Sequence, residues 1–455
     1  NLIYWFLVIP YRAWTDPILL LILNSLACAA AGLGLFYLAR AFLDDSPWSL
    51  AAPLVFFISP LVQDANLYDY HSITLATAFL VWGIWAFETG RPRAAWTLIV
   101  LALLCKEDVP LVVMMLGLVY LPARATRRRG VLLLAAGAVY LTVVMGVVVP
   151  AFNEGQLTTK IEGRQNRYAW LWQRPELILQ TLTRPDRLRL PLYFLLSGVL
   201  VAWRGRRWLW MMLPALAMGF FSWTTWMTRL TGAYYWITAE AVIIIACLAA
   251  ARPRERTGRI RRSPLVYLMA ATVAFSLLFS PLPYSIWVHP SNFAAGVARE
   301  ELQELRAAIP RDASLSVQNN LGPHLAHRWN VAAFPRGWNT ARFILLHMRY
   351  PGGPANGLFV RTQPQFLYQL PLRALASGVA DLAHSPEWGL VVQKNGFYLL
   401  ERDRPDILRA TEVRVILEED TRRLMESFAR AEEHRSPLAD YVVDGISWAE
   451  LLGRR

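Results

Sequence analysis

The sequence predicts a mainly α-helical membrane domain with many spans, followed by a soluble α/β domain. Of 455 residues, 55% are hydrophobic and 17% are charged, whereas about 25% of the residues of a soluble protein are charged. Long apolar runs fill the chain to about residue 283, and the rest has an ordinary polar balance. We therefore expect a multi-pass domain over residues 1–283 and an α/β domain with a helical tail over 284–455.

The apolar runs are interrupted by short polar connections, and each run is a candidate membrane helix. The first run begins at Asn1 without a preceding Met, so we expect the domain to be N-terminally incomplete. Within the domain, residues 151–189 carry aromatic anchors before an amphipathic pattern and predict an interfacial helix. The candidate spans are 1–10, 17–40, 46–63, 72–88, 94–105, 109–122, 130–150, 190–203, 207–222, 234–251 and 264–282.

Basic clusters between the apolar runs predict how the membrane domain is oriented across the bilayer. If the cluster at 124–129 is cytoplasmic and the segments alternate, the clusters at 91–93, 204–207 and 252–262 are cytoplasmic as well. This is the bias of the positive-inside rule. The net charge of +13 is then explained by topology, and we expect no nucleic-acid partner. The expected location is the plasma (inner) membrane, with the C-terminal domain extracytoplasmic.

One connection, at 106–108, reads Lys-Glu-Asp between two short apolar runs. Consecutive residues of a straight helix would spread these charges around its axis. Pro110 favours a helix start just before it, with Asp108 as the N-cap. Two interpretations stay open: a hairpin turn whose charges face water, or a site in which Lys106 presents a cation to a phosphate while Glu107 or Asp108 orients it or acts as a base.

Two further polar stretches fall on the same predicted outer face. In ANLYDYHSI, Asp69 and His71 suit a base with its orienting partner or a pair of metal ligands, unless Ser72 merely caps a helix. In WTTWMTRLTGAYYW, Arg229 is the lone basic residue among aromatic ones. That stretch predicts either an interfacial aromatic belt or a wall for a sugar or prenyl chain, with Arg229 as a phosphate ligand.

The C-terminal part alternates strand and helix patterns. Strands are predicted at 312–318 and 331–335, and a hairpin joins 389–393 to 396–402. Helices are predicted at 292–309 and 366–383. His324 and His327 are spaced for one helix face, but no further ligands are obvious nearby, so a structural or surface role is expected.

Two of these stretches together resemble a known family. NLYDYHSITLATAFLVWGIWAFETGR followed by LALLCKEDVPLVVMMLGLVYL is similar to domain-of-unknown-function family 2079, which consists of prokaryotic multi-pass membrane proteins, and IPRDASLSVQNNLGPHLAHR also resembles it. That family resembles the glycosyltransferase C superfamily, which implies sugar transfer from a polyprenyl-phosphate donor at the outer face. Lys106 before Pro110 matches the position of the superfamily's phosphate-binding lysine in a KGP-like motif, but Glu107 and Asp108 replace the glycine of that motif. No counterpart of its first-loop catalytic acid follows Asn1, since Asp16 reads as a helix cap.

This resemblance implies a glycosyltransferase C-like membrane enzyme that contacts membrane lipid. Its predicted catalytic residues are Asp69, His71, Glu107 and Asp108, and its phosphate ligands are Lys106 and Arg229. A divalent metal is compatible with these residues but not demanded. Two alternatives stay open: a non-catalytic structural or lipid-binding subunit of a protein complex, and a transporter. The donor sugar, the acceptor and the oligomeric state are left open by the sequence.

Overall fold

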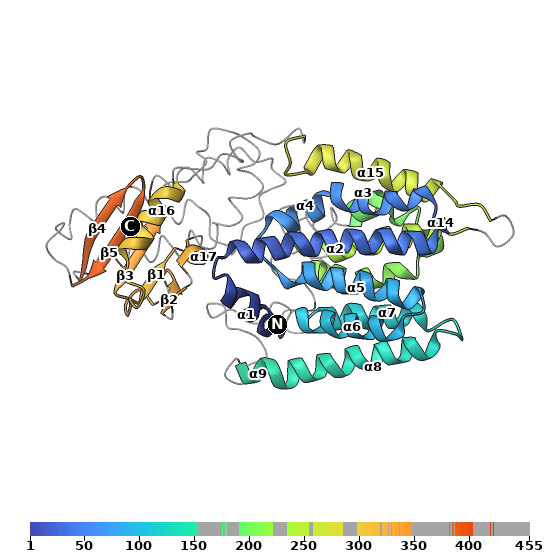
Figure 1. The fold of residues 1–455 in the computed structure, drawn as a ribbon, viewed down its shortest axis with the longest axis horizontal. Helices are drawn as coiled ribbons and strands as arrows, with labels where there is room; N and C mark the ends of the chain where they lie inside the picture. The colour runs from blue at the N-terminus through green and yellow to red at the C-terminus, as the bar shows by residue number, and fades with distance from the viewer. Residues whose placement is uncertain are drawn as a thin grey trace. The chain divides into compact units, whose positions relative to one another are not determined.

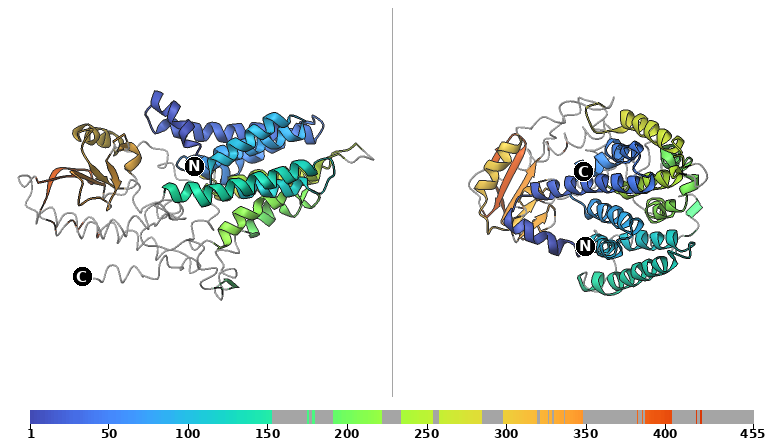
Figure 2. Two further views of the ribbon diagram at one scale, coloured as in Figure 1. Left: turned by 90° about the horizontal axis from the view of Figure 1, so that it is seen from below. Right: turned by 45° about the vertical axis from the view of Figure 1, so that its right-hand side comes forward.

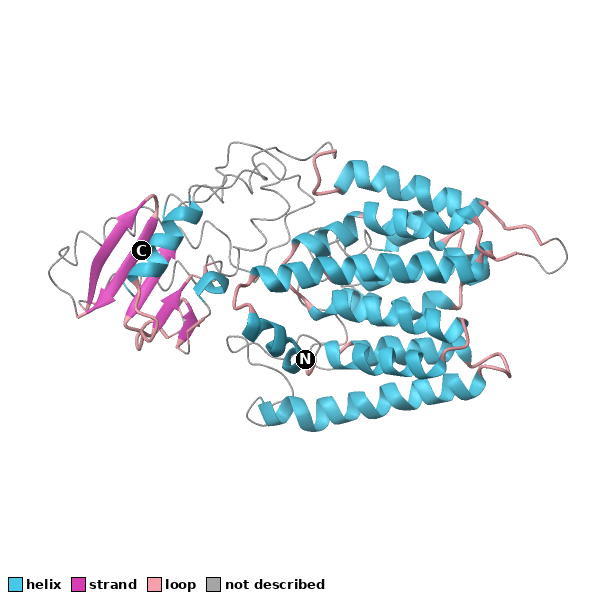
Figure 3. Cartoon of the chain, viewed as in Figure 1, coloured by secondary structure: helices cyan, strands magenta, loops and turns pink. Residues whose placement is uncertain are grey.

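The computed structural model describes residues 1–152, 191–221, 234–253, 258–284, 298–318, 321–347 and 387–403, except 326, 329 and 336, together with a few isolated positions. The chain forms two compact units, residues 1–286 and 287–455. In the described ranges the first unit is helical, and the second contains a small sheet (Figure 3). The predicted mainly α-helical class with strands in the C-terminal part is therefore confirmed.

Most helices of the first unit run side by side as a bundle (Figures 1 and 2). They follow the apolar runs of the sequence, and the connections carry the polar residues. Asp16 accepts a hydrogen bond from the backbone N–H of Ile18 at 2.9 Å just before α2, although Pro17 holds the N-cap position of that helix. The elements are α1 (Tyr4–Ala13), α2 (Ile18–Phe42), η1 (Pro47–Leu50), α3 (Ala51–Ile58), α4 (Pro60–Leu67), α5 (Ser72–Glu88), α6 (Pro92–Cys105), α7 (Val109–Tyr120), α8 (Arg127–Val143), η2 (Val144–Val148), α9 (Val149–Phe152), η3 (Leu195–Val199), η4 (Trp203–Gly205), η5 (Trp208–Met212), α13 (Leu213–Phe221), α14 (Ile237–Ala251) and α15 (Ser263–Phe279).

The predicted span 46–63 is wrong as a single helix. The chain bends by 51° between Pro47–Ile58 and Pro60–Leu67. Pro60 lacks a backbone N–H, and it disfavours the α conformation of the residue before it. Ser59 accordingly adopts φ −57° and ψ 126°, which ends α3 and starts α4.

Two helices in the described ranges are long and apolar enough to cross a bilayer, Ile18–Phe42 and Arg127–Ala151. The bent pair around Ser59 makes a third if it counts as one span. Six shorter apolar helices have 10–17 residues, fewer than the roughly 20 that a straight crossing needs. Outward-facing side chains are apolar along the long helices, with Leu26 59% and Val139 63% exposed, as suits contact with lipid tails.

The core of the first unit surrounds α14. Every residue of α14 except Ala249 is buried, and a helix that is apolar on all sides belongs at the centre of a bundle. Small residues let neighbouring helices approach closely. A Cβ added at Gly130 of α8 would lie 2.7 Å from the carbonyl oxygen of Gly117 in α7.

The second unit contains a five-stranded sheet in the order β2-β1-β3-β5-β4. Strand β1 runs parallel to β2 and β3, whereas β5 runs antiparallel to β3 and β4. The predicted hairpin is confirmed, since Asn395 and Gly396 both have positive φ at its turn. The elements are α16 (Ala298–Ala308), β1 (Leu315–Val317), α17 (Gly322–Leu325), β2 (Val331–Ala333), β3 (Phe343–His347), β4 (Trp388–Lys394) and β5 (Phe397–Arg402).

Several predictions fall on residues that the structure does not describe. The interfacial helix at 151–189 and the tail at 403–455 lie outside the described residues apart from a few positions. The helix at 366–383, except position 382, and Arg229 lie outside them as well. These stay predictions from the sequence.

Candidate functional site

The three charged residues 106–108 form the connection between two short helices, as the sequence predicts. Helix α6 ends at Cys105 and α7 begins at Val109. Lys106 adopts an extended conformation with φ −154° and ψ 149°, which breaks the helical path. Pro110 lies in the first turn of α7, where its missing N–H costs no hydrogen bond. The charges therefore gather at one break rather than spreading around a helix.

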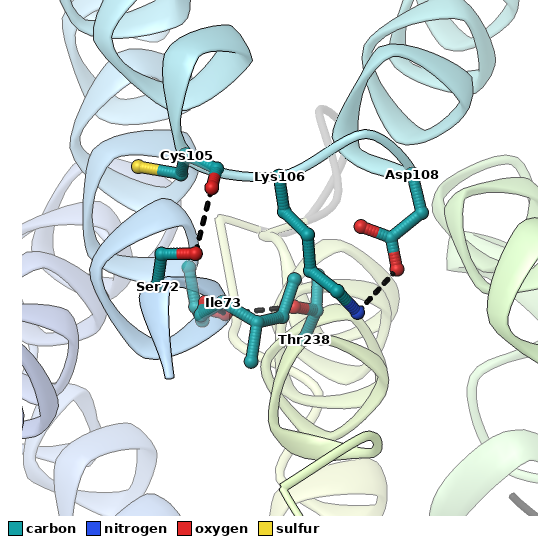
Figure 4. Close-up of polar contacts among 7 residues, drawn as sticks. Ser72, Ile73, Cys105, Lys106, Asp108 and Thr238 are labelled. Atoms are coloured by element: carbon teal, nitrogen blue, oxygen red, sulfur yellow. Dashed lines mark hydrogen bonds and ion pairs between the residues drawn. The ribbon is translucent and has the colours of Figure 1, made fainter. Parts of the chain in front are cut away.

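Lys106 and Asp108 form an ion pair with little contact with solvent. The Lys106 ammonium lies 2.9 Å from Asp108 Oδ2, and the two side chains are 15% and 11% exposed (Figure 4). Burial lowers the pKa of Lys106, but the charge and hydrogen bond of Asp108, with a smaller contribution from Glu107, raise it above its ordinary value. The ammonium is therefore charged at neutral pH.

The predicted N-cap position of Asp108 is confirmed, but its side chain does not cap the helix. Asp108 occupies the N-cap position, but it makes no side-chain cap hydrogen bond. Its carboxylate turns to Lys106 instead, because a buried ammonium needs a counter-charge more than the helix start needs a cap. The other carboxylate oxygen, Asp108 Oδ1, is buried and has no hydrogen-bond partner in the described part of the chain.

Two tyrosines just before α14 face the same ammonium. The Lys106 nitrogen lies 5.7 Å from the ring centroid of Tyr234 and 5.6 Å from that of Tyr235. The two rings lie 4.3 Å apart. A cation over aromatic faces gains about 0.5–2 kcal/mol. Tyr234 and Tyr235 therefore form an aromatic wall beside the ion pair.

His71 joins this wall from the start of α5. Its ring is stacked on Tyr234, with centroids 3.4 Å apart and an interplanar angle of 21°, and Tyr68 lies 5.4 Å from both. His71 Nδ1 lies 2.9 Å from the backbone carbonyl oxygen of Asp69. Because a carbonyl can only accept, Nδ1 carries the proton, and Nε2 is the nitrogen left to accept one.

The environment of His71 keeps its imidazole neutral. Burial lowers the pKa of His71, and the nearby positive charge of Lys106 adds to that effect. The hydrogen bond to the backbone of Asp69 acts in the opposite direction without cancelling the shift. His71 thus has the protonation state of a general base at neutral pH.

Short hydrogen bonds fix the elements that carry these residues. Ser72 Oγ donates to the carbonyl oxygen of Cys105 at 2.6 Å and so joins the start of α5 to the end of α6 (Figure 4). The hydroxyl oxygens of Thr77 and Thr238 lie 2.7 Å apart and join α5 to α14. The structure rules out the alternative that Ser72 caps α5: His71 holds the N-cap position, and Ser72 donates to a carbonyl at the end of α6.

Of the predicted site residues, Lys106, Asp108 and His71 come together around the aromatic wall. The side chains of Asp69 and Glu107 are exposed, and Asp69 orients His71 through its backbone rather than its carboxylate. Arg229 lies outside the described residues. In the described ranges, no three His, Cys, Asp or Glu side chains gather where they could hold a metal ion.

A family model described as "Predicted membrane protein (DUF2079)" matches residues 1–351. The chain belongs to this family. The match covers the whole helical unit with the site, and it extends through β3 of the DUF2079 chain. No curated protein and no solved structure matches the DUF2079 chain.

Sequence reasoning did not single out one further polar residue of the DUF2079 chain. Glu240 lies in the first turn of α14 and is 1% exposed. It is the lone charged residue of the apolar run 234–251. Ionisable residues within membrane segments are costly and usually functional, so its isolation was a usable signal.

The ion pair predicts an asymmetric response to substitution. Asp108→Asn leaves the buried ammonium of Lys106 without its counter-charge, so we expect a loss of about 3–5 kcal/mol of unfolding free energy. The double variant Lys106→Met/Asp108→Asn removes both charges and should lose less than Asp108→Asn alone. Chemical unfolding in detergent micelles measures both. Equal losses of unfolding free energy in the two variants would contradict the pairing. The exposed pair Lys394–Glu304 is the matched control, and removing its charges should change the unfolding free energy little.

His71 predicts a pH dependence. Because its pKa is lowered in the native state, the unfolded chain binds a proton near pH 6.5 that the native site does not bind. Its contribution to stability is therefore present above about pH 6.5 and is lost as the pH falls below that value. Ring ¹⁵N shifts of bilayer-embedded protein should show the His71 imidazole neutral at pH 6.5, with the proton on Nδ1. The variant His71→Gln identifies the signal of His71. A half-protonated His71 ring at pH 6.5 would refute the predicted neutral state.

Proposed function

We propose that this chain binds the phosphate of a polyprenyl-phosphate sugar at Lys106 and transfers the sugar to an acceptor. The observation that carries the proposal is a buried, charged ammonium held at a helix break beside an aromatic wall. A buried cation that serves only packing is generally replaceable by apolar side chains without loss of stability. Its presence among apolar helices therefore favours a role in binding an anion.

The ammonium of Lys106 has donors to spare for a phosphate. It carries three N–H bonds, and Asp108 Oδ2 accepts one of them. A phosphate that takes the remaining donors gains charge-assisted hydrogen bonds in a site with little water. The apolar outer surfaces of the long helices suit the prenyl chain of such a lipid. The faces of Tyr234 and Tyr235 suit the sugar ring.

The residues near Lys106 fit the proposed transfer step. The acceptor hydroxyl oxygen attacks the anomeric carbon, and the bond from that carbon to the phosphate oxygen breaks. The phosphate leaves with the bonding electrons, where the positive charge of Lys106 stabilises it. The acceptor proton passes to a base, and His71 Nε2 is the described group in the right protonation state.

The proposal includes an orientation. We place the connection 106–108 and the C-terminal unit on the outer face of the plasma membrane, because the basic clusters then lie in the cytoplasm. The exposed side chains of Asp69 and Glu107 would then face the space from which an acceptor arrives. They are the remaining candidates for contacts with the acceptor.

A second candidate function is a non-catalytic lipid-binding subunit. Two observations favour it: Asp108 already neutralises Lys106, and the Asp69 carboxylate does not orient His71. In that case the site would bind a lipid phosphate without breaking a bond. Binding and transfer therefore need separate measurements.

Proteoliposomes that contain the purified chain and a radiolabelled polyprenyl-phosphate hexose test both functions. Wild type should retain the lipid and transfer the hexose to an added glycan or lipid acceptor. Lys106→Ala should lose transfer by about 10²–10³-fold, the usual effect of removing one group that stabilises a developing negative charge. His71→Gln should lower transfer but retain the lipid.

Lys394→Ala is the matched control, because it removes an exposed lysine from the second unit. Asp69→Asn tests the contribution of an exposed carboxylate. If wild type retains the lipid without transferring the hexose, and Lys106→Ala no longer retains the lipid, the result would support the lipid-binding subunit instead. Equal transfer by wild type, Lys106→Ala and Asp69→Asn would refute the proposed site.

A further inference from the structure

Helix α14 carries a second polar feature in its first turn. Its Glu240 side chain is 1% exposed and lies among apolar residues on the central helix of the bundle. Among the ion pairs of the described residues, none includes Glu240. A carboxylate in such surroundings loses its hydration with no cation in return, at a cost of several kcal/mol.

The neighbours of Glu240 are neutral or acidic. Ser59, at the bend between α3 and α4, lies close to Glu240 and to Tyr193. The titratable groups that face this cluster in the described ranges are Tyr193, Asp64 from α4 and Cys247 from the next turns of α14. All of them are acids, so none supplies a positive charge. The cluster therefore has no internal means of neutralising an ionised Glu240.

Two oxygen atoms of this cluster are left without hydrogen bonds. Glu240 Oε2 and Ser59 Oγ are both buried, and neither has a partner in the described part of the chain. The backbone carbonyls freed by the bend are already used. Gln63 Nε2 donates to the carbonyl oxygens of Phe57 and Ile58 at 3.0 and 3.1 Å, and Ser276 Oγ donates to that of Ile58 at 2.7 Å.

These contacts decide which ligand suits the site. A metal cation held by oxygen ligands needs about six of them, and in the described part of the chain no three His, Cys, Asp or Glu side chains gather where they could hold one. A proton needs one acceptor besides the atom that carries it. We propose that Glu240 is a proton-binding site of the resting protein, with the proton on Oε2 donated to Ser59 Oγ.

The bound proton links the bend to the central helix. When it is present, both unpartnered oxygens gain a hydrogen bond, and no net charge lies in the core. Its release would leave a negative charge next to three acids and an apolar helix. Alkaline conditions should therefore destabilise the contact between α14 and the bend around Ser59.

Infrared spectroscopy of the full chain in bilayers tests the proposal. Wild type should show the C=O stretching band of a buried, protonated carboxylic acid at pH 7, with a shift in heavy water. Glu240→Gln keeps the neutral shape and hydrogen-bonding capacity and should lose this band. Ser59→Ala should keep the band but move it to higher frequency, because the proton loses its acceptor.

Glu88→Gln is the matched control. Glu88 closes α5 and forms an ion pair with Arg252 at 2.7 Å, so it should not contribute to the band. The wild-type spectrum is informative without any variant: absence of a protonated-carboxyl band at pH 7 would overturn the proposal. A band that survives in Glu240→Gln, or that disappears in Glu88→Gln, would overturn it as well.

Discussion

The buried ion pair between Lys106 and Asp108 is the interaction on which the junction of α5, α6 and α7 depends. An ammonium with 15% of its side chain exposed remains charged only if a carboxylate meets it, and Asp108 does so at 2.9 Å. That contact requires a break in the helix, so that residues two apart can face each other. The break in turn exposes the carbonyl of Cys105, which the hydroxyl of Ser72 satisfies from α5. One charge thereby fixes the arrangement of three helices.

The same requirement for internal partners shapes the rest of the bundle, because lipid offers no hydrogen bonds. Asn24 of α2 donates to the carbonyl oxygen of Ala65 at 2.9 Å and accepts from Thr74 Oγ1 at 2.5 Å. At the bend between α3 and α4, Gln63 donates hydrogen bonds to two backbone carbonyl oxygens that the helix leaves free. Glu240 departs from this rule by lacking a partner for Oε2, and a bound proton restores it. The two proposed sites thus follow from one constraint, met by a counter-charge at Lys106 and by neutralisation at Glu240.

Much of the fold was predictable because apolar runs and prolines act locally. The run 72–88 became α5 over the same residues, and Pro110 marked the start of α7. The bend at Ser59 was missed although Pro60 signals it, since hydrophobicity continues across the break. For the site, the sequence named Lys106 and His71, and it offered Asp108 as a residue that orients Lys106, but it did not assign the neighbouring tyrosines to the site. The aromatic wall depends on the contact of His71 with Tyr234, two residues far apart in the sequence, which no local pattern encodes.

The central claim is that Lys106 binds a lipid phosphate, and the sequence makes it directly measurable. The lysines of the chain are Lys106, Lys160 and Lys394, so ¹⁵Nζ-lysine labelling yields few ammonium signals in solid-state NMR. With polyprenyl phosphate in the bilayer, we predict ¹⁵N–³¹P dipolar dephasing of one signal, and that signal should vanish in Lys106→Met. Dephasing confined to Lys160 or Lys394, or no dephasing when the lipid is retained, would contradict the account.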